Sequence, residues 1–268
     1  MQEFLNRVLH GNCSEITGCM PDECIDLTLT SPPYDNLRTY NGYEFPFEEI
    51  VKELYRVTKQ GGVVVWVVGD ETVKGNETGT SFKQALYFKE IGFNLADTMI
   101  YHKTDLAFPK YGHKKYPSAF EYMFIFSKGK IKTFNPIKDR ANKLAGSVMS
   151  GTVRQSDGTV KPSRAKGKKV AEFGHRSNVW GYSTGKGKSS SDAFAFKHPA
   201  IFPEKLATDH ILTWSNEGDI VLDCMCGSGT TLKMAYTNNR NFIGIDYSSE
   251  YVELSQKRLK QVMTKSNH

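Results

Sequence analysis

The chain has 268 residues, 39% of them apolar and 24% charged, with a formal net charge of +6; this suits one α/β domain with an insertion. No run of about 18 apolar residues occurs, and the start, Met1-Gln2-Glu3-Phe4-Leu5, lacks the features of a signal peptide, so we expect a cytoplasmic protein without a membrane span. Five cysteines without a C-x-x-C pair argue against a disulfide framework or a zinc site.

Residues before about position 128 alternate between patterns typical of strands and of amphipathic helices. Cys24 to Thr30 alternates apolar and polar residues, and two prolines then end the strand. The run from Val63 to Val68 is apolar throughout, which is typical of a parallel strand covered on both faces. The patterns predict strands over 24–30, 63–68, 97–102 and 121–126, and helices over 47–57 and 81–91.

After Lys128 the periodicity stops, and Gly, Ser, Lys and Arg dominate to about Ser191. Residues 128–188 hold 15 Lys and Arg against 3 Asp and Glu, whereas the rest of the chain holds 20 against 26. This excess of positive charge favours a phosphate-bearing polymer as a partner, although a solvated loop would have the same composition. We therefore expect an insertion over 129–195 and a main domain made of 1–128 and 196–268.

Regular patterns return after the insertion. Pro203 suits the first turn of a helix that runs to about Thr213. The remaining patterns predict strands over 219–223 and 241–245, and helices over 230–238 and 248–263. Strands that alternate with helices indicate an α/β fold, with a mostly parallel mixed sheet and helices on both faces.

A glycine-rich loop follows the strand that ends at residue 223. Its sequence is Asp223-Cys224-Met225-Cys226-Gly227-Ser228-Gly229-Thr230-Thr231, and a second acid, Asp246, ends the next strand. Glycines let a ligand approach the backbone, and an acid at a neighbouring strand end accepts hydrogen bonds from ribose hydroxyls. The spacing matches neither a dinucleotide fingerprint nor a phosphate loop. It favours a cofactor with a ribose and no phosphates, such as S-adenosylmethionine, although a plain strand-to-helix turn is the alternative.

The tetrapeptide Ser31-Pro32-Pro33-Tyr34 follows the first predicted strand. The exocyclic amine of a nucleobase is a poor nucleophile, because its lone pair is delocalised into the ring. The Ser31 side chain and the Pro32 carbonyl, held outward by the stiff Pro-Pro segment, offer two acceptors that would localise this lone pair. Tyr34 offers a face on which an extruded base stacks. Both motifs follow ends of expected parallel strands, so we expect them to converge; a strand ending in a proline turn is the alternative.

In their order along the chain, these motifs resemble those of the amino-group DNA methyltransferases, which modify N4 of cytosine or N6 of adenine. The matching stretches are Thr30 to Tyr34, Glu121 to Gly129, His198-Pro199-Ala200-Ile201-Phe202-Pro203-Glu204-Lys205 and Asp223 to Thr231. The tetrapeptide precedes the glycine loop, as in the permuted group usually called beta. The resemblance covers roughly residues 9–128 and 196–262, and it departs from the family at Cys224, where Pro or Ala is usual.

The resemblance implies roles for individual residues. Ser31, Pro32, Pro33 and Tyr34 would form the catalytic site, and Phe202 and Pro203 would pack near the methionine part of the cofactor. The implied cofactor-binding residues are Asp223, Cys224, Cys226, Gly227, Ser228, Gly229, Thr230 and Asp246. No metal is implied, because methyl transfer from a sulfonium is a direct displacement.

The resemblance also implies S-adenosylmethionine as the cofactor, double-stranded DNA as the substrate, base flipping, and target recognition by residues 129–195. A homodimer and a cognate restriction endonuclease are both open, because some family members have them. Ser at the first position of the tetrapeptide favours cytosine N4 over adenine N6. An RNA-base or protein-glutamine methyltransferase, or an inactive DNA-binding regulator, stays an alternative, although the motif order, the basic insertion and the intact motifs argue against these.

Overall fold

The structure, a computed structural model, describes residues 1–33, 45–105, 116–185, 187–198, 201 and 203–265. The chain forms two compact units. Residues 1–135 together with 178–268 are called the main unit here, and residues 136–177 are called the ribbon.

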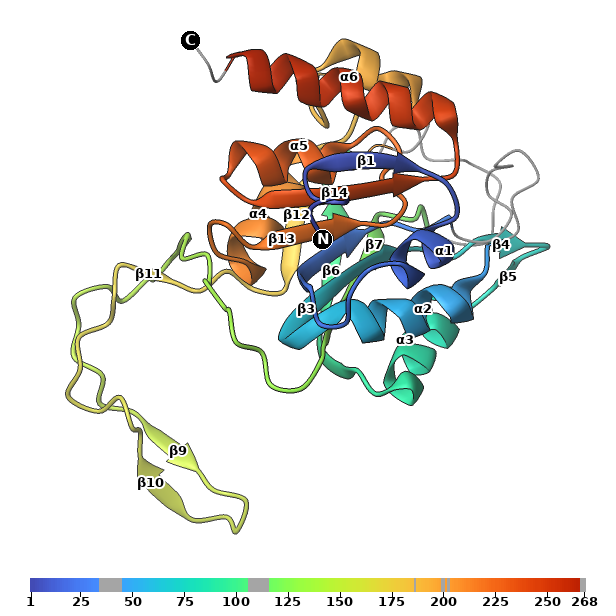
Figure 1. Cartoon of the computed structure of the whole chain (residues 1–268). Helices are drawn as coiled ribbons and strands as arrows, with labels where there is room; N and C mark the ends of the chain where they lie inside the picture. The colour runs from blue at the N-terminus through green and yellow to red at the C-terminus, as the bar shows by residue number, and fades with distance from the viewer. Residues whose placement is uncertain (34–44, 106–115, 186, 199–200, 202, 266–268) are drawn as a thin grey trace. The chain divides into compact units, whose positions relative to one another are not determined.

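An eight-stranded sheet forms the centre of the main unit (Figure 1). The strand order is β1-β14-β13-β2-β3-β7-β6-β12, in which β7 runs antiparallel to both neighbours and the other pairs are parallel. The strands are β1 (Arg7–His10), β2 (Ile25–Thr30), β3 (Thr58–Val68), β6 (Asn94–Lys103), β7 (Phe120–Ser127), β12 (Val179–Tyr182), β13 (Ile220–Asp223) and β14 (Asn241–Asp246). A small hairpin, β4 (Thr72–Val73) with β5 (Asn76–Glu77), follows β3. This mostly parallel mixed sheet confirms the predicted fold class.

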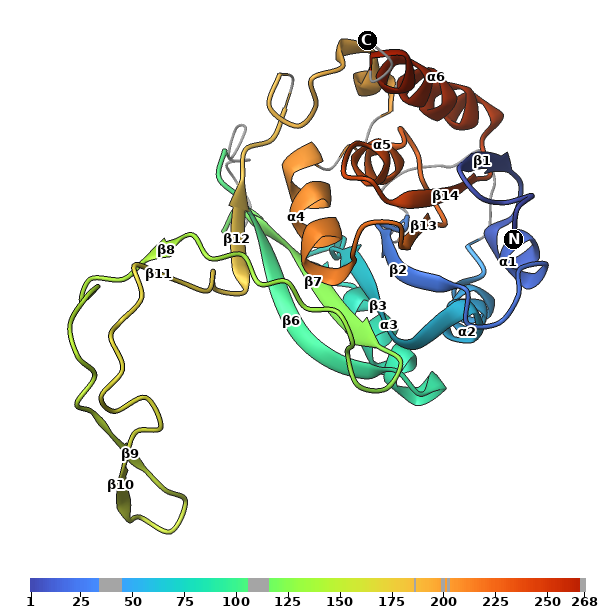
Figure 2. The ribbon, with the colours of Figure 1, turned by 60° about the vertical axis from the view of Figure 1, so that its left-hand side comes forward.

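Helices cover both faces of the sheet, as Figures 1 and 2 show. One face carries α1 (Cys13–Gly18), α2 (Phe47–Val57) and α3 (Thr80–Ile91). The other carries α4 (Glu204–Trp214), α5 (Thr230–Thr237) and α6 (Ser249–Lys265), and a short 3-10 helix, η1 (Ala193–Lys197), precedes α4. Within the described ranges, no helix is both long and apolar enough to cross a bilayer.

The strand β3 is buried because it lies in the middle of the sheet with helices on both faces. Every residue from Val63 to Val68 is buried, as the uninterrupted apolar run predicts. On the face covered by α2 and α3, Trp66 lies edge-on to Phe88, and Phe88 stacks on Phe126 with ring centres 4.2 Å apart. The indole nitrogen of Trp66 donates to Gln84 Oε1 at 2.8 Å, which satisfies the one polar atom of that ring inside the core.

The first and last strands of the chain lie side by side. The strand β1 pairs in parallel with β14, with His10 opposite Asp246. Just before β1, the side-chain oxygen of Asn6 accepts from the backbone nitrogen of Phe242 at 3.0 Å. One side of the sheet is therefore built from residues that lie far apart in the sequence.

The strand β12 joins the sheet, although its residues fall within the insertion predicted over 129–195. It pairs in parallel with β6 at the edge of the sheet. Trp180 and Tyr182 are buried. The Trp180 ring lies 4.7 Å from that of His210, and the Tyr182 hydroxyl donates to Asp209 Oδ2 at 2.8 Å. These aromatic side chains belong to the core of the main unit, so the separate unit is shorter than the predicted insertion.

The ribbon is a pair of antiparallel segments without a core of its own. Its ladders pair β8 (Arg140–Ala141) with β11 (Phe173–Gly174) and β9 (Thr152–Arg154) with β10 (Val160–Pro162), and both can be followed in Figures 1 and 2. None of residues 136–177 is buried. The ribbon holds 10 Lys and Arg against 3 Asp and Glu. Backbone hydrogen bonds and a few exposed side-chain contacts, such as the ion pair of Arg176 with Asp139, hold this strongly positive unit together, an arrangement that is marginally stable in water.

The buried hydroxyl of Thr28, in the middle of β2, has no hydrogen-bond partner among the described residues. Valine has the same shape and no polar atom. We therefore expect Thr28→Val to leave the free energy of unfolding in urea unchanged, or to raise it by about 1 kcal/mol. The control is Thr58→Val, which removes a hydroxyl that donates to the Leu54 carbonyl at 2.5 Å, and it should lose about 1 kcal/mol. An equal loss in both variants would contradict this expectation.

Candidate active site

Three parallel strands, β2, β13 and β14, are neighbours and end at the same edge of the sheet. The register places Leu222 opposite Thr28, and Asp223 opposite Gly244. From these ends the chain continues into the tetrapeptide and into the glycine loop, while β14 ends at Asp246. The two motifs therefore converge at the edge where open α/β sheets bind ligands.

A buried hydrogen bond joins the two motifs directly. Thr30 Oγ1 donates to Asp223 Oδ1 at 2.8 Å. Beside it, Thr231 Oγ1 donates to the carbonyl oxygen of Leu29 at 3.3 Å, which ties the first turn of α5 to β2. Since Thr30 immediately precedes Ser31, the start of the tetrapeptide and the start of the glycine loop are held beside each other.

Asp223 is a carboxylate with 2% of its surface exposed. Its Oδ1 also accepts from the backbone N–H of Met225 at 3.3 Å. Burial raises the pKa of Asp223 to about 6, and the hydrogen bond from Thr30 opposes this rise only in part. The side chain therefore carries a negative charge at neutral pH that it loses in mildly acidic solution.

Gly227 and Gly229 adopt left-handed backbone conformations, with φ of +49° and +74°. A Cβ on Gly229 would lie 2.7 Å from Ser255 Oγ, and a Cβ on Gly227 would lie 2.7 Å from Nε2 of His198. Ser255 also donates to the carbonyl oxygen of Gly227 at 2.7 Å. Both the backbone conformation and the close approach of neighbouring side chains therefore require glycine at these two positions.

Asp246 is hydrogen-bonded to the backbone on both sides. Its Oδ2 accepts from the N–H of Gly227 at 2.7 Å, and its Oδ1 accepts from the N–H of Ser248 at 2.9 Å. Burial raises the pKa of Asp246, which these two hydrogen bonds oppose. A carboxylate has about four lone-pair positions, so two remain for further donors. Two adjacent hydroxyls of a ribose are donors of this kind.

Several side chains of the glycine loop point into the protein. Cys224, Cys226, Ser228 and Thr230 are all buried. Burial raises the pKa of the Cys226 thiol well above its usual value, so this thiol stays protonated and is a poor nucleophile. The loop therefore presents its backbone and the flanking acids to a ligand.

The other predicted site residues lie before α4 and after β2. Ser31 and Pro33 are half-buried, and Pro32 is buried, directly after the end of β2. Pro203 is buried and precedes the first residue of α4. Tyr34 and Phe202 lie outside the described residues, so their roles stay predictions.

Four residues that shape the site were given no role from the sequence. Thr30 looks like any polar position of an alternating strand. The other three, Tyr251, Ser255 and Arg258, lie on α6 with the spacing i, i+4, i+7, which places them on one face of the helix. That spacing is the signal that could have revealed them.

The class of protein follows from three features: the order of the strands, the glycine loop and the acids at two strand ends. Together they define an enzyme with the fold of S-adenosylmethionine-dependent methyltransferases. Solved structures share this fold. The PvuII DNA methyltransferase, described as cytosine-N4-specific, superposes with a TM-score of 0.68 at 21% identity, over 97% of this chain and 90% of that chain. A DNA modification methylase from Thermus thermophilus, solved with S-adenosyl-L-methionine, gives 0.61 at 21% identity, over 96% and 95%.

Sequence comparison shows the family. The family model described as DNA methylase, for N6 and N4 methyltransferases, matches residues 25–257. Orphan methyltransferase M.BamHII of Bacillus amyloliquefaciens is 60% identical over 241 residues, which are 89% of this chain and 90% of that protein. Type II methyltransferase M.HinfI of Haemophilus influenzae is 26% identical over an alignment of 292 residues with gaps, which covers 100% of this chain and 72% of that protein. The chain belongs to the DNA methylase family.

Family membership decides between alternatives that the sequence left open. The chain is a DNA amino-methyltransferase, so family membership decides against the RNA-base and protein-glutamine alternatives. Enzymes of this family take the methyl group from S-adenosylmethionine, so this is the cofactor of the chain.

The raised pKa of Asp223 predicts how cofactor binding depends on pH. S-adenosylmethionine carries a net positive charge, which a carboxylate attracts and a protonated acid does not. Because the pKa is about 6, we expect the dissociation constant for S-adenosylmethionine to be about tenfold higher at pH 5 than at pH 7.5. Equilibrium dialysis with labelled cofactor measures this.

The matched variants are Asp223→Asn and the surface control Glu3→Gln. Asp223→Asn should bind weakly with a flatter pH profile, retaining only the slope that Asp246 contributes. Glu3→Gln should keep the original profile. A dissociation constant for the unaltered protein that does not change between pH 5 and pH 8 would contradict the prediction.

Proposed function

We propose that this chain transfers a methyl group from S-adenosylmethionine to the N4 amino group of cytosine in double-stranded DNA. The observation that carries the proposal is the hydrogen bond between Thr30 and Asp223, because it ties the tetrapeptide to the cofactor loop. Ser at position 31 favours cytosine over adenine, as the resemblance implies. N6 of adenine is the alternative target, and the order of the motifs supports membership of the beta group.

The proposed chemistry at the amine depends on the tetrapeptide. The Ser31 side chain and the Pro32 carbonyl would accept hydrogen bonds from the amino group and direct its lone pair outward. Both residues directly follow the end of β2, so the strand fixes where the tetrapeptide begins. Tyr34 would stack on the flipped base. No thiol attack is needed, in agreement with the protonated state of Cys226.

The proposed cofactor site consists of the glycine loop and its flanking acids. Asp246 has lone pairs left for the two ribose hydroxyls, and Asp223 supplies negative charge close to the loop. Gly227 and Gly229 would let the cofactor lie against the backbone. When bound, S-adenosylmethionine supplies a sulfonium methyl group that is open to direct displacement. Phe202 and Pro203 would border its methionine part.

Residues 129–195, and above all the ribbon at 136–177, are proposed to recognise the target sequence in DNA. The ribbon is strongly positive and has no buried residue, so exposed Lys and Arg side chains along it can reach the phosphates of a nucleic acid. A two-stranded antiparallel ribbon has a width that the major groove of B-DNA admits.

M.BamHII is named an orphan methyltransferase, and we propose by likeness that this chain also acts without a paired endonuclease. A homodimer stays a prediction.

Expression of this chain in a host without DNA methylation of its own tests the base directly. We expect sequencing with modified-base detection to find N4-methylcytosine in one short sequence context. Ser31→Ala should lower the rate of modification about a hundredfold, because one acceptor for the amine is lost. Ser127→Ala, at the opposite edge of the sheet, is the control and should modify DNA normally. N6-methyladenine would overturn the choice of base, and unmodified DNA would overturn the activity.

Binding of DNA at several salt concentrations tests the role of the ribbon. Replacing the exposed Lys166, Lys168 and Lys169 by Gln should weaken DNA binding and lower the slope of log K against log salt by up to about 3. The control replaces Lys52, Lys74 and Lys89, which are exposed on the main unit. If both triple variants lose the same affinity and slope, the ribbon has no special role in DNA binding.

A further inference from the structure

One face of α6 holds the glycine loop through three side chains. The ring of Tyr251 lies 4.4 Å from that of His198, the residue that borders Gly227. One turn on, Ser255 donates to the carbonyl oxygen of Gly227. After a further turn, Arg258 Nη1 donates to the carbonyl oxygen of Ser228 at 2.7 Å. The loop is therefore fixed by α6 as well as by the strands from which it emerges.

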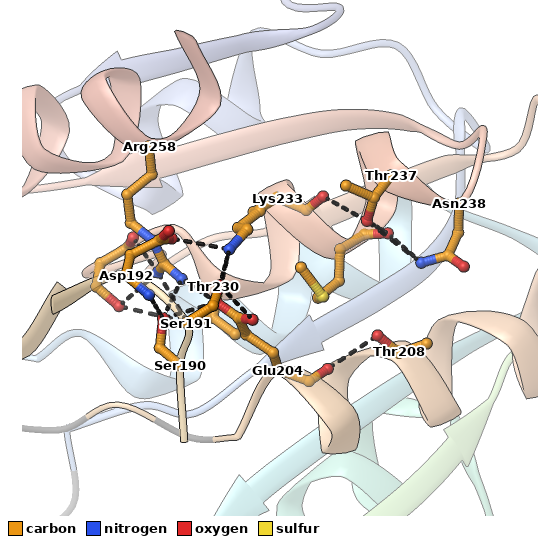
Figure 3. Close-up of polar contacts among 12 residues, drawn as sticks. Ser190, Ser191, Asp192, Glu204, Thr208, Thr230, Lys233, Thr237, Asn238 and Arg258 are labelled. Atoms are coloured by element: carbon orange, nitrogen blue, oxygen red, sulfur yellow. Dashed lines mark hydrogen bonds and ion pairs between the residues drawn. The ribbon is translucent and has the colours of Figure 1, made fainter. Parts of the chain in front are cut away.

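Arg258 is completely buried, with 0% of its surface exposed. Its guanidinium contacts several segments at once (Figure 3). Nε donates to Asp192 Oδ2 at 3.0 Å, and Nη2 donates to Glu204 Oε1 at 2.8 Å and to Ser190 Oγ at 3.1 Å, while Nη1 holds Ser228. A planar group with five donors in fixed directions suits such a junction.

A second buried cation completes the cluster. The ammonium of Lys233, on α5, donates to Asp192 Oδ2 and Glu204 Oε1, both at 2.8 Å, and to Ser191 Oγ at 3.0 Å. Two cations thus face two carboxylates, so the charges of the cluster balance. Burial alone would raise the pKa of Glu204, but the hydrogen bond from Lys233 and the nearby Arg258 charge lower it, so the carboxylate stays ionised.

The contacts of Arg258 connect two parts of the proposed cofactor site. On one side is the glycine loop, held through the Ser228 carbonyl. On the other side is Glu204, the first residue of α4, which directly follows Pro203. The side chain therefore fixes the separation between the loop and the segment that the resemblance places beside the methionine part.

We propose that Arg258 is a positioning residue for cofactor binding: its planar fork holds the Ser228 carbonyl and Glu204 at the separation that S-adenosylmethionine requires. This rests on the proposed cofactor site. Apolar side chains of the same volume would stabilise the fold as well as these four charged side chains do. Stability of the fold therefore does not explain why charged residues occupy the cluster. Charged groups with fixed donor directions also hold their partners in one defined arrangement.

Arg258→Lys separates charge from geometry, because an ammonium keeps the positive charge and loses the planar fork. We expect the KM for S-adenosylmethionine to rise about tenfold, while kcat and the KM for DNA stay within about twofold. The matched control is Arg56→Lys on α2. Arg56 also grips two carboxylates and two carbonyls, of Glu53, Asp22, Thr17 and Met20, on the other face of the sheet. The Arg56→Lys variant should have a lower melting temperature and an unchanged KM for the cofactor.

If Arg258→Lys does not fold, the double variant Arg258→Met with Glu204→Gln removes one charge of each sign and keeps the cluster neutral. It should show the same selective rise in the KM for the cofactor. An unchanged KM for S-adenosylmethionine in a folded variant overturns the proposal. An equal loss of cofactor binding, DNA binding and kcat also overturns the proposal, because it would indicate a general structural defect. Cofactor binding by the unaltered protein is also measured without DNA. If the protein binds the cofactor but does not methylate DNA, the proposed function fails while the role of Arg258 in cofactor binding can still be tested.

Discussion

The hydrogen bond between Thr30 and Asp223 is the contact on which the proposed active site depends. It joins the ends of two neighbouring parallel strands, one leading to the tetrapeptide and the other to the glycine loop. Displacement at a methyl group requires the acceptor amine and the donor to meet in one geometry, and a misplacement of about 1 Å costs about a hundredfold in rate. A buried, direct bond between the two strand ends is a means of keeping that geometry.

Buried charge is used in two different ways around the glycine loop. In the described part of the chain, Asp223 and Asp246 are held by hydroxyl and backbone donors, and burial raises the pKa of both. Asp223 has no partner cation among the described residues, and a cationic cofactor can supply one. The cluster around Arg258 has its charges balanced internally (Figure 3), so it can fix positions without attracting a ligand.

Much of the fold followed from the sequence, because long periodic segments carry their own signal. The apolar run from Val63 to Val68 predicted a strand, which the structure shows as part of β3, and the helical pattern over 47–57 predicted α2. The convergence of the motifs followed from the rule for parallel strand ends. The strand β12 could not be predicted, because it is stabilised by pairing with β6 and by contacts with Asp209 and His210 on α4, none of which its own four residues reveal. The partners of Arg258 could not be read from the sequence either, although its spacing from Tyr251 and Ser255 on α6 marks a shared helix face.

A double-mutant cycle on Thr30→Val and Asp223→Asn tests the central claim most directly, with kcat/KM for DNA methylation as the quantity measured. If the bond between these residues couples the two motifs, each single change should cost about tenfold, and the double variant should lose no more than the worse single variant. Losses that multiply, to about a hundredfold in the double variant, would show that the two residues act independently and would contradict the account.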